Sequence, residues 1–119
     1  MKILVVDDSR AMRSIVTRSL RATTRYADAH VIEASDGPEA LAKIEAEAPD
    51  VVLSDWNMPG MDGIDLLESL RSRGSTVKLG FVTSESTPEM YDRAIAAGAR
   101  FLVTKPFTPA SLERALEAA

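Results

Sequence analysis

The sequence predicts an α/β fold in which parallel strands alternate with helices, in a single domain over residues 1–119. Five short runs rich in β-branched or apolar residues are separated by segments with helical periodicity. Two runs, Ile3 to Val6 and Val51 to Leu53, are apolar throughout, as expected for parallel strands covered on both faces. Such a sheet needs helices on both sides. The five runs begin near Lys2, His30, Val51, Val77 and Phe101.

Length and composition agree with one compact domain. The chain has 119 residues, of which 45% are hydrophobic, and this can supply a single continuous core. Its net charge of -4, with both signs mixed, argues against a nucleic-acid partner. No apolar run approaches the ~20 residues that cross a membrane, and the first residues lack the plan of a secretory signal. We therefore expect a cytoplasmic protein with no membrane partner.

The first helix should follow the first strand and pack one face against the sheet. At about 100° per residue, its apolar side chains gather on one face, which we expect to lie in the core. They are Met12, Ile15, Val16 and Leu20. Arginines gather on the opposite face, namely Arg10, Arg18, Arg21 and Arg25.

Each later helix has a residue pattern typical of a helix start, either a capping side chain or a proline at the first helical position. These patterns are Gly37-Pro38, Asp62, Thr87-Pro88 and Thr108-Pro109. Pro49 should stop the second helix, and Gly98 stands where the fourth needs a left-handed residue at its end.

The carboxyl ends of the predicted strands are unusually polar, and in an open parallel sheet ligands bind beyond those ends. The first strand ends in Asp7-Asp8, the third in Asp55, the fourth in Thr83 and the fifth in Lys105. Cysteine is absent and His30 is the only histidine, which excludes thiolate chemistry and a histidine or cysteine metal cluster. The predicted site therefore works with oxygen atoms and one amine.

Three carboxylates at one place repel one another, by about 4 kcal/mol for two unit charges ~4 Å apart at an effective dielectric near 20. Either one carboxylate is protonated or a divalent cation binds, and an all-oxygen site favours magnesium, with manganese as an alternative. Asp55 ends a central strand and is our candidate for a nucleophile that forms an aspartyl phosphate. Lys105 and Thr83 suit the oxygens of a phosphoryl group.

Motifs in order along essentially the whole chain resemble the response-regulator receiver-domain family of two-component signalling, of the chemotaxis type. They are Val5-Val6-Asp7-Asp8-Ser9, the nine residues from Asp55 to Gly63, Thr83, and Lys105-Pro106-Phe107. The resemblance implies a flavodoxin-like (βα)5 three-layer sandwich with a parallel five-stranded sheet in the order 2-1-3-4-5.

The same resemblance implies a role for each residue of the metal site. Asp55 would be the phosphoacceptor. Asp8 and Asp55 would bind magnesium directly, together with the backbone carbonyl of Asn57, while Asp7 would act largely through a bound water.

Further roles follow from the resemblance around the phosphoryl group. Thr83 and Lys105 would contact its oxygens, and a cis Lys105-Pro106 bond would aim the lysine. Asn57 and Glu85 would flank the path of the hydrolysing water and tune the lifetime of the phosphoryl group, although both are also ordinary polar loop residues. Their identity is that of the chemotaxis type, so we expect fairly quick self-dephosphorylation.

The sequence departs from the family at the position three residues before Lys105. Most receivers carry Tyr or Phe there as part of a switch with the threonine, whereas this chain has Leu102. Phe101 cannot substitute, because a one-residue offset on a strand points its side chain to the opposite face, and we expect it in the core. We expect Trp56 to be a partly exposed neighbour of the site.

The leading hypothesis is a stand-alone receiver, monomeric when unphosphorylated, that takes phosphate from a histidine kinase or phosphotransfer protein and then binds a target protein. The arginine face of the first helix is either a solvated surface or part of the kinase contact. Phosphoacceptance and dephosphorylation would be self-catalysed, so we do not expect a conventional enzyme. Two alternatives remain, an unphosphorylated docking module and a magnesium-dependent phosphohydrolase.

Overall fold

The computed structural model describes residues 1–119 as five strands and five helices that alternate along the chain. The strands are β1 (Lys2–Val6), β2 (His30–Ala34), β3 (Val51–Ser54), β4 (Lys78–Thr83) and β5 (Phe101–Thr104). The helices are α1 (Arg10–Arg21), α2 (Gly37–Glu47), α3 (Gly63–Ser72), α4 (Pro88–Ala97) and α5 (Pro109–Ala118). No helix combines the length and the apolar character that a membrane span requires.

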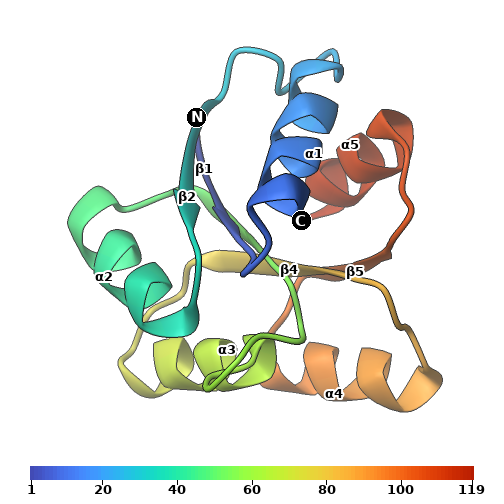
Figure 1. Ribbon diagram of the computed structural model, residues 1–119. Coiled ribbons are helices and arrows are strands. Elements are labelled where there is room, and N and C mark those ends of the chain that lie inside the picture. Colours follow the sequence, from blue (N-terminus) through green and yellow to red (C-terminus); the bar gives the residue numbers. More distant parts are fainter.

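All strands are parallel, and their order in the sheet is β2-β1-β3-β4-β5. Helices α1 and α5 lie on one face, above the sheet in Figure 1, and α3 and α4 lie on the other. Helix α2 packs beside α3 and against β1 and β2. The predicted flavodoxin-like three-layer sandwich is therefore confirmed.

Two apolar cores fill the spaces between the layers. One lies under α2, α3 and α4 and includes Phe81 of β4, and the other lies under α1 and α5 and includes Phe101 of β5. Every residue of β1 from Ile3 to Val6, and every residue of β3, is buried. These strands lie in the middle of the sheet, which explains their unbroken apolar runs.

Three helix starts follow the predicted patterns, whereas α2 begins one residue earlier than Gly37-Pro38 indicates and is capped by Asp36. The side chains of Asp62, Thr87 and Thr108 each accept a hydrogen bond from the backbone N–H three residues later, and Asp36 does the same for α2. Gly98 has a φ of 103° after α4, so it adopts the left-handed conformation that the sequence predicts.

One prediction for α1 is partly wrong. Val16 and Leu20 are buried, but Met12 is only half-buried and Ile15 is 43% exposed. At 100° per residue Ile15 is displaced from the centre of the Val16 and Leu20 face, so it lies at the margin of the contact with the sheet. The apolar face of α1 is therefore narrower than the periodicity indicates.

Candidate functional site

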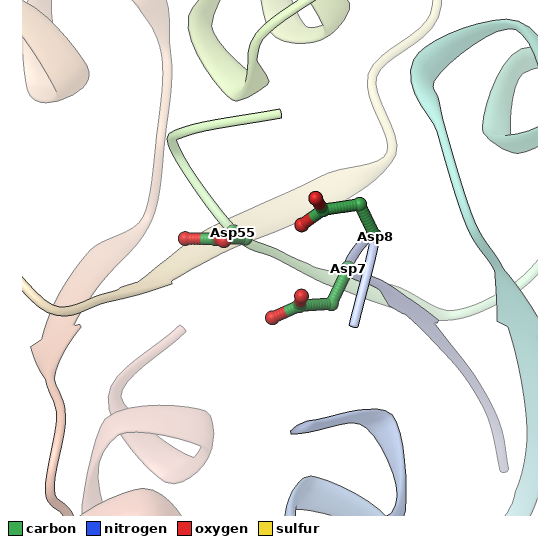
Figure 2. A group of neighbouring side chains, drawn as sticks. All are labelled: Asp7, Asp8 and Asp55. Carbon is green, nitrogen blue, oxygen red and sulfur yellow. The ribbon is translucent and has the colours of Figure 1, made fainter. Parts of the chain in front are cut away.

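The three aspartates predicted as metal ligands meet at the carboxyl edge of the sheet. Asp7 and Asp8 directly follow β1, and Asp55 directly follows the neighbouring strand β3 (Figure 2). Each offers a carboxylate oxygen that lies within 4.8 Å of the other two. The backbone N–H of Asp55 donates to the carbonyl of Val6 at 2.9 Å, which continues the β1–β3 pairing up to the site.

Asp7 is the most constrained of the three. It is buried, and its Oδ1 accepts the backbone N–H of Ser9 at 2.9 Å while its Oδ2 accepts the ammonium of Lys105 at 3.2 Å. Asp8 is exposed, and its carboxylate makes no hydrogen bond or ion pair. Asp8 therefore has its oxygens available for a ligand, whereas those of Asp7 are already engaged.

Asp55 is partly buried and carries the site's main electrostatic conflict. Its pKa is raised above the ordinary value of 3.8, chiefly because burial disfavours the charged form, and the nearby Asp7 adds to the rise. Lys105, whose Nζ lies 3.7 Å from Oδ1, and the backbone N–H groups of Trp56 and Asn57 act in the opposite direction. Burial outweighs these opposing contributions, so the pKa of Asp55 stays above its ordinary value.

A glycine lets α3 approach Asp55 closely. A Cβ atom at Gly63 would lie 2.3 Å from the carbonyl oxygen of Asp55, a distance that no side chain tolerates. The N–H of Gly63 donates to the carbonyl of Trp56 at 2.7 Å, and the Ser54 hydroxyl donates to the Asp55 carbonyl at 2.8 Å. These contacts hold the backbone that follows Asp55.

Two further predicted residues, Thr83 and Lys105, lie at the same edge. Thr83 is the last residue of β4 and is fully buried, and Lys105 directly follows β5. The backbone N–H of Lys105 donates to the carbonyl of Thr83 at 2.7 Å, and the Lys105–Pro106 peptide bond is cis. Lys105 directs its ammonium toward both Asp7 and Asp55.

Asn57 and Glu85 lie at the rim of the site. Both are exposed, and the backbone N–H of Glu85 lies 3.5 Å from the Thr83 hydroxyl. The carbonyl oxygen of Asn57 accepts no hydrogen bond, so it is open to a ligand.

Of the hydrophobic residues near the site, Trp56 lies differently from its prediction, whereas Phe101 lies as predicted. Leu102 is half-buried, is the register partner of Phe81 on β4 and packs against the core under α3 and α4. Phe101 is buried in the opposite core, as predicted. Trp56, however, is only 6% exposed, with its ring centroid 4.9 Å from that of Phe81. The expectation of a partly exposed tryptophan is wrong, because the chain after Asp55 turns the indole inward.

Sequence reasoning missed one residue of the site, Arg13. Its guanidinium donates to the carbonyl of Asp7 at 2.7 Å and to the carboxylate of Glu33 on β2 at 2.8 Å. In the sequence Arg13 is one of several arginines of the first helix, and only the tertiary structure singles it out.

A pocket of about 300 Å³ lies beside the site, lined by Met12, Ile15, Lys105, Pro106 and Phe107. The larger cavity of about 510 Å³ lies between α2 and α3 and includes none of the predicted site residues. None of the pockets is lined by the three aspartates, and the pocket beside Lys105 is formed by α1 and the segment after β5.

Comparison with known proteins gives consistent matches. The sequence model of the family "Response regulator receiver domain" matches residues 3–117 of this chain. Chemotaxis protein CheY1 of Helicobacter pylori is 40% identical over 120 residues, covering 98% of this chain and 94% of that protein. Chemotaxis protein CheY-3 of Vibrio cholerae is 40% identical over 119 residues, covering 98% and 89%.

Solved structures agree. The chemotaxis protein CheY4 of Vibrio cholerae superposes with a TM-score of 0.86 at 36% identity, covering 98% of this chain and 95% of that chain. The receiver domain of the Francisella response regulator 1452 gives the same TM-score at 28% identity, with coverages of 98% and 94%. The likeness therefore extends over nearly the whole fold.

Proposed function

Because this chain belongs to the response regulator receiver family, the phosphorylation-dependent signalling switches of two-component systems, we propose that Asp55 is its phosphoacceptor. The observation that supports this proposal most strongly is that the Asp55 carboxylate lies close both to the carboxylates of Asp7 and Asp8 and to the ammonium of Lys105. Asp7 has both carboxylate oxygens engaged, and Asp8 has no contact with the lysine. Asp55 is the carboxylate that combines a nearby cation with access from the rim.

In the proposed reaction, a carboxylate oxygen of Asp55 attacks the phosphorus of a phosphohistidine. The new O–P bond forms as the N–P bond breaks, and the electron pair of that bond leaves with the histidine nitrogen. Lys105 and Thr83 lie at the same edge and are placed to bind the transferring group's oxygens, where charge is concentrated. In the second half of the cycle, water attacks the phosphorus, the bond between phosphorus and the Asp55 oxygen breaks with its electron pair returning to the carboxylate, and inorganic phosphate leaves.

The donor set fits a magnesium ion. Three carboxylates within 4.8 Å of one another and the open carbonyl of Asn57 are hard oxygen ligands, and the exposed Asp8 leaves space for retained waters. We propose that Asp8, Asp55 and the Asn57 carbonyl hold the ion, with Asp7 acting through water. When bound, the ion supplies positive charge that neutralises the phosphoryl oxygens and lowers the pKa of Asp55.

Acetyl phosphate and magnesium test the phosphoacceptor directly. We expect a phosphoryl mass increase in the wild-type protein and none in the Asp55→Asn variant. Asp92→Asn, the same chemical change at an exposed site on α4, should still be labelled. The rate at which the added phosphoryl mass is lost gives the phosphoryl lifetime, and comparing this rate in Asn57→Ala and Glu85→Ala with the wild type tests whether these residues tune it.

The outcomes separate the alternatives. No labelling of the wild-type protein, even with a cognate kinase, would leave the unphosphorylated docking module. Turnover of a phosphate ester in molar excess over protein would instead favour a phosphohydrolase.

For the phosphodonor, we propose a histidine kinase or phosphotransfer protein that docks over α1 beside the pocket next to Lys105. Ile15 is exposed on α1 and lines that pocket together with Phe107, and Arg18 lies one turn further along the helix, also exposed. Helix α1 contains four arginines and no acidic residue in a chain of net charge -4. An acidic helical partner with an apolar centre is complementary to this surface.

The docking proposal predicts a selective defect. Ile15→Asp with Arg18→Glu should slow phosphotransfer from the kinase by about tenfold or more, while labelling by acetyl phosphate stays at the wild-type rate. Arg93→Glu, on α4 across the sheet, is the matched charge reversal and should leave both rates unchanged. Equal loss with both donors would indicate damage to the site and contradict docking at this surface.

A further inference from the structure

Arg13 connects three elements at the end of the sheet where the aspartates lie. It belongs to α1, its Nη1 donates to the carbonyl of Asp7 after β1 at 2.7 Å, and its Nε donates to Oε1 of Glu33 on β2 at 2.8 Å. The side chain is only 14% exposed. A guanidinium is suited to this task, because it is a rigid planar fork that offers two donors in fixed directions.

The bond to Asp7 acts on the peptide group that joins Asp7 to Asp8. The N–H of Asp7 donates to the carbonyl of Ala34 at 3.1 Å, which extends the β1–β2 pairing, and the carbonyl of Asp7 accepts the Arg13 bond. The plane of the following peptide is thereby fixed. Asp8 makes no side-chain contact of its own, so the direction of its carboxylate depends on that backbone.

We propose that Arg13 is a positioning residue for the metal site, which holds the Asp7–Asp8 peptide so that the Asp8 carboxylate meets that of Asp55. Glu33 in turn orients the guanidinium. The inference rests on the proposed magnesium site and extends it to a residue that touches no ligand oxygen. Groups that orient metal ligands from behind commonly change metal affinity by about 10-fold to 100-fold when they are removed.

The other arginines of α1 show that this role is specific. Arg10 and Arg18 are exposed, and their side chains make no hydrogen bond or ion pair. Arg21 donates to the carbonyls of Ala27 and Ala29, where it ties the end of α1 to the segment before β2. Only Arg13 contacts the backbone of the carboxylate cluster.

The direction of the effect distinguishes positioning from charge. A positive side chain near the carboxylates repels a divalent cation, so its removal alone should tighten magnesium binding slightly. Loss of positioning should weaken binding instead. Arg10, the first residue of α1, provides the matched control, because Arg10→Met removes one positive charge from the same helix without breaking a contact.

The test is calorimetric titration of the full chain with magnesium alone, which needs no phosphoryl donor. We expect Arg13→Met to raise the magnesium Kd by roughly 10-fold, the lower end of the range for removed orienting groups. Arg13→Lys should fall between Met and wild type, since one ammonium cannot reproduce the two-way fork. If Arg13→Met does not fold, Arg13→Lys carries the test, because it keeps the positive charge and removes only the paired donors.

The outcomes are separable. An unchanged Kd in folded Arg13→Met, or a Kd that falls as it does in Arg10→Met, would overturn the positioning role while leaving the metal site intact. A loss of unfolding free energy with an unchanged Kd would make Arg13 purely structural and would equally overturn it. Absence of magnesium binding by the wild-type protein would instead overturn the proposed metal site.

Discussion

Phe81 and Thr83 lie two residues apart on the same strand, and both are fully buried, yet their surroundings differ in polarity. Phe81 sits in the middle of the sheet among apolar neighbours and against the ring of Trp56. Thr83 ends the strand at the edge of the sheet that carries Asp7, Asp55 and Lys105, where charged and polar residues gather. The middle of the sheet gains stability from burial, whereas its carboxyl edge keeps charges together at a cost in stability.

The polar residues of the interior reinforce this contrast. Four polar or charged residues are buried, and three of them, Asp7, Ser54 and Thr83, stand at the carboxyl ends of strands. At the amino end, by contrast, Asp50 is exposed and accepts the backbone N–H of Lys2 at 2.7 Å. Buried polar groups therefore gather at the carboxyl end of the sheet, whereas Asp50 at the amino end remains exposed to water.

The largest expected effect is the loss of stability caused by a substitution in the middle of the sheet. Phe81→Ala should lower the free energy of unfolding by about 4 kcal/mol, because it removes a fully buried ring and leaves a cavity beside Trp56. Urea denaturation followed by Trp56 fluorescence measures the change. Phe81→Leu should lose much less, and a loss below about 1 kcal/mol for Phe81→Ala would contradict the assignment of stability to this layer.

The second largest effect is expected for a substitution at the carboxyl edge of the sheet. Lys105→Met should slow labelling by acetyl phosphate on the order of 100-fold, because it removes the fixed cation that faces the proposed phosphoacceptor. It should also raise the pKa of Asp55 further, since Lys105 now holds that pKa down. Lys78→Met, at the amino end of β4, is the control and should label at the wild-type rate. Similar rates in both variants would contradict a role for the lysine in transfer.

The smallest expected effect tests whether the charge of Asp55 at the carboxyl edge lowers the stability of the fold. Without magnesium at pH 7, Asp55→Asn should stabilise the fold by about 1 kcal/mol. Burial raises the pKa of Asp55, so its protonated form favours the folded state. That contribution is complete below the ordinary pKa of 3.8 and is lost as pH rises through the higher folded pKa. The advantage of the variant should therefore appear above pH 3.8 and vanish below it.

Denaturation at several pH values, with and without magnesium, checks this prediction. Magnesium should stabilise only the protein that retains Asp55 and should narrow the difference. Asp92→Asn should show no such pH dependence, because Asp92 is exposed on α4. An Asp55→Asn variant less stable than wild type at pH 7 would show that the carboxylate is well accommodated, and the contrast between middle and edge would fail there.

Much of the fold could be predicted from local sequence. Unbroken apolar runs identified β1 and β3, and the caps at Asp62, Thr87 and Thr108 marked helix starts, because strand burial and helix capping depend on residues close together in the chain. The periodicity of α1 was less exact for Ile15. How wide a helix face is covered depends on the elements packed against it, which lie far along the chain.

The sequence by itself determined which residues end the parallel strands, and therefore that Asp7, Asp8, Asp55, Thr83 and Lys105 share one edge. Only the tertiary structure decided how they differ: Asp7 bonded on both oxygens, Asp8 free, and Asp55 with a raised pKa. It also turned Trp56 inward and selected Arg13 from the arginines of its helix. The reason is physical, since strand ends follow from local pattern, whereas burial and hydrogen-bond partners arise between segments distant in sequence.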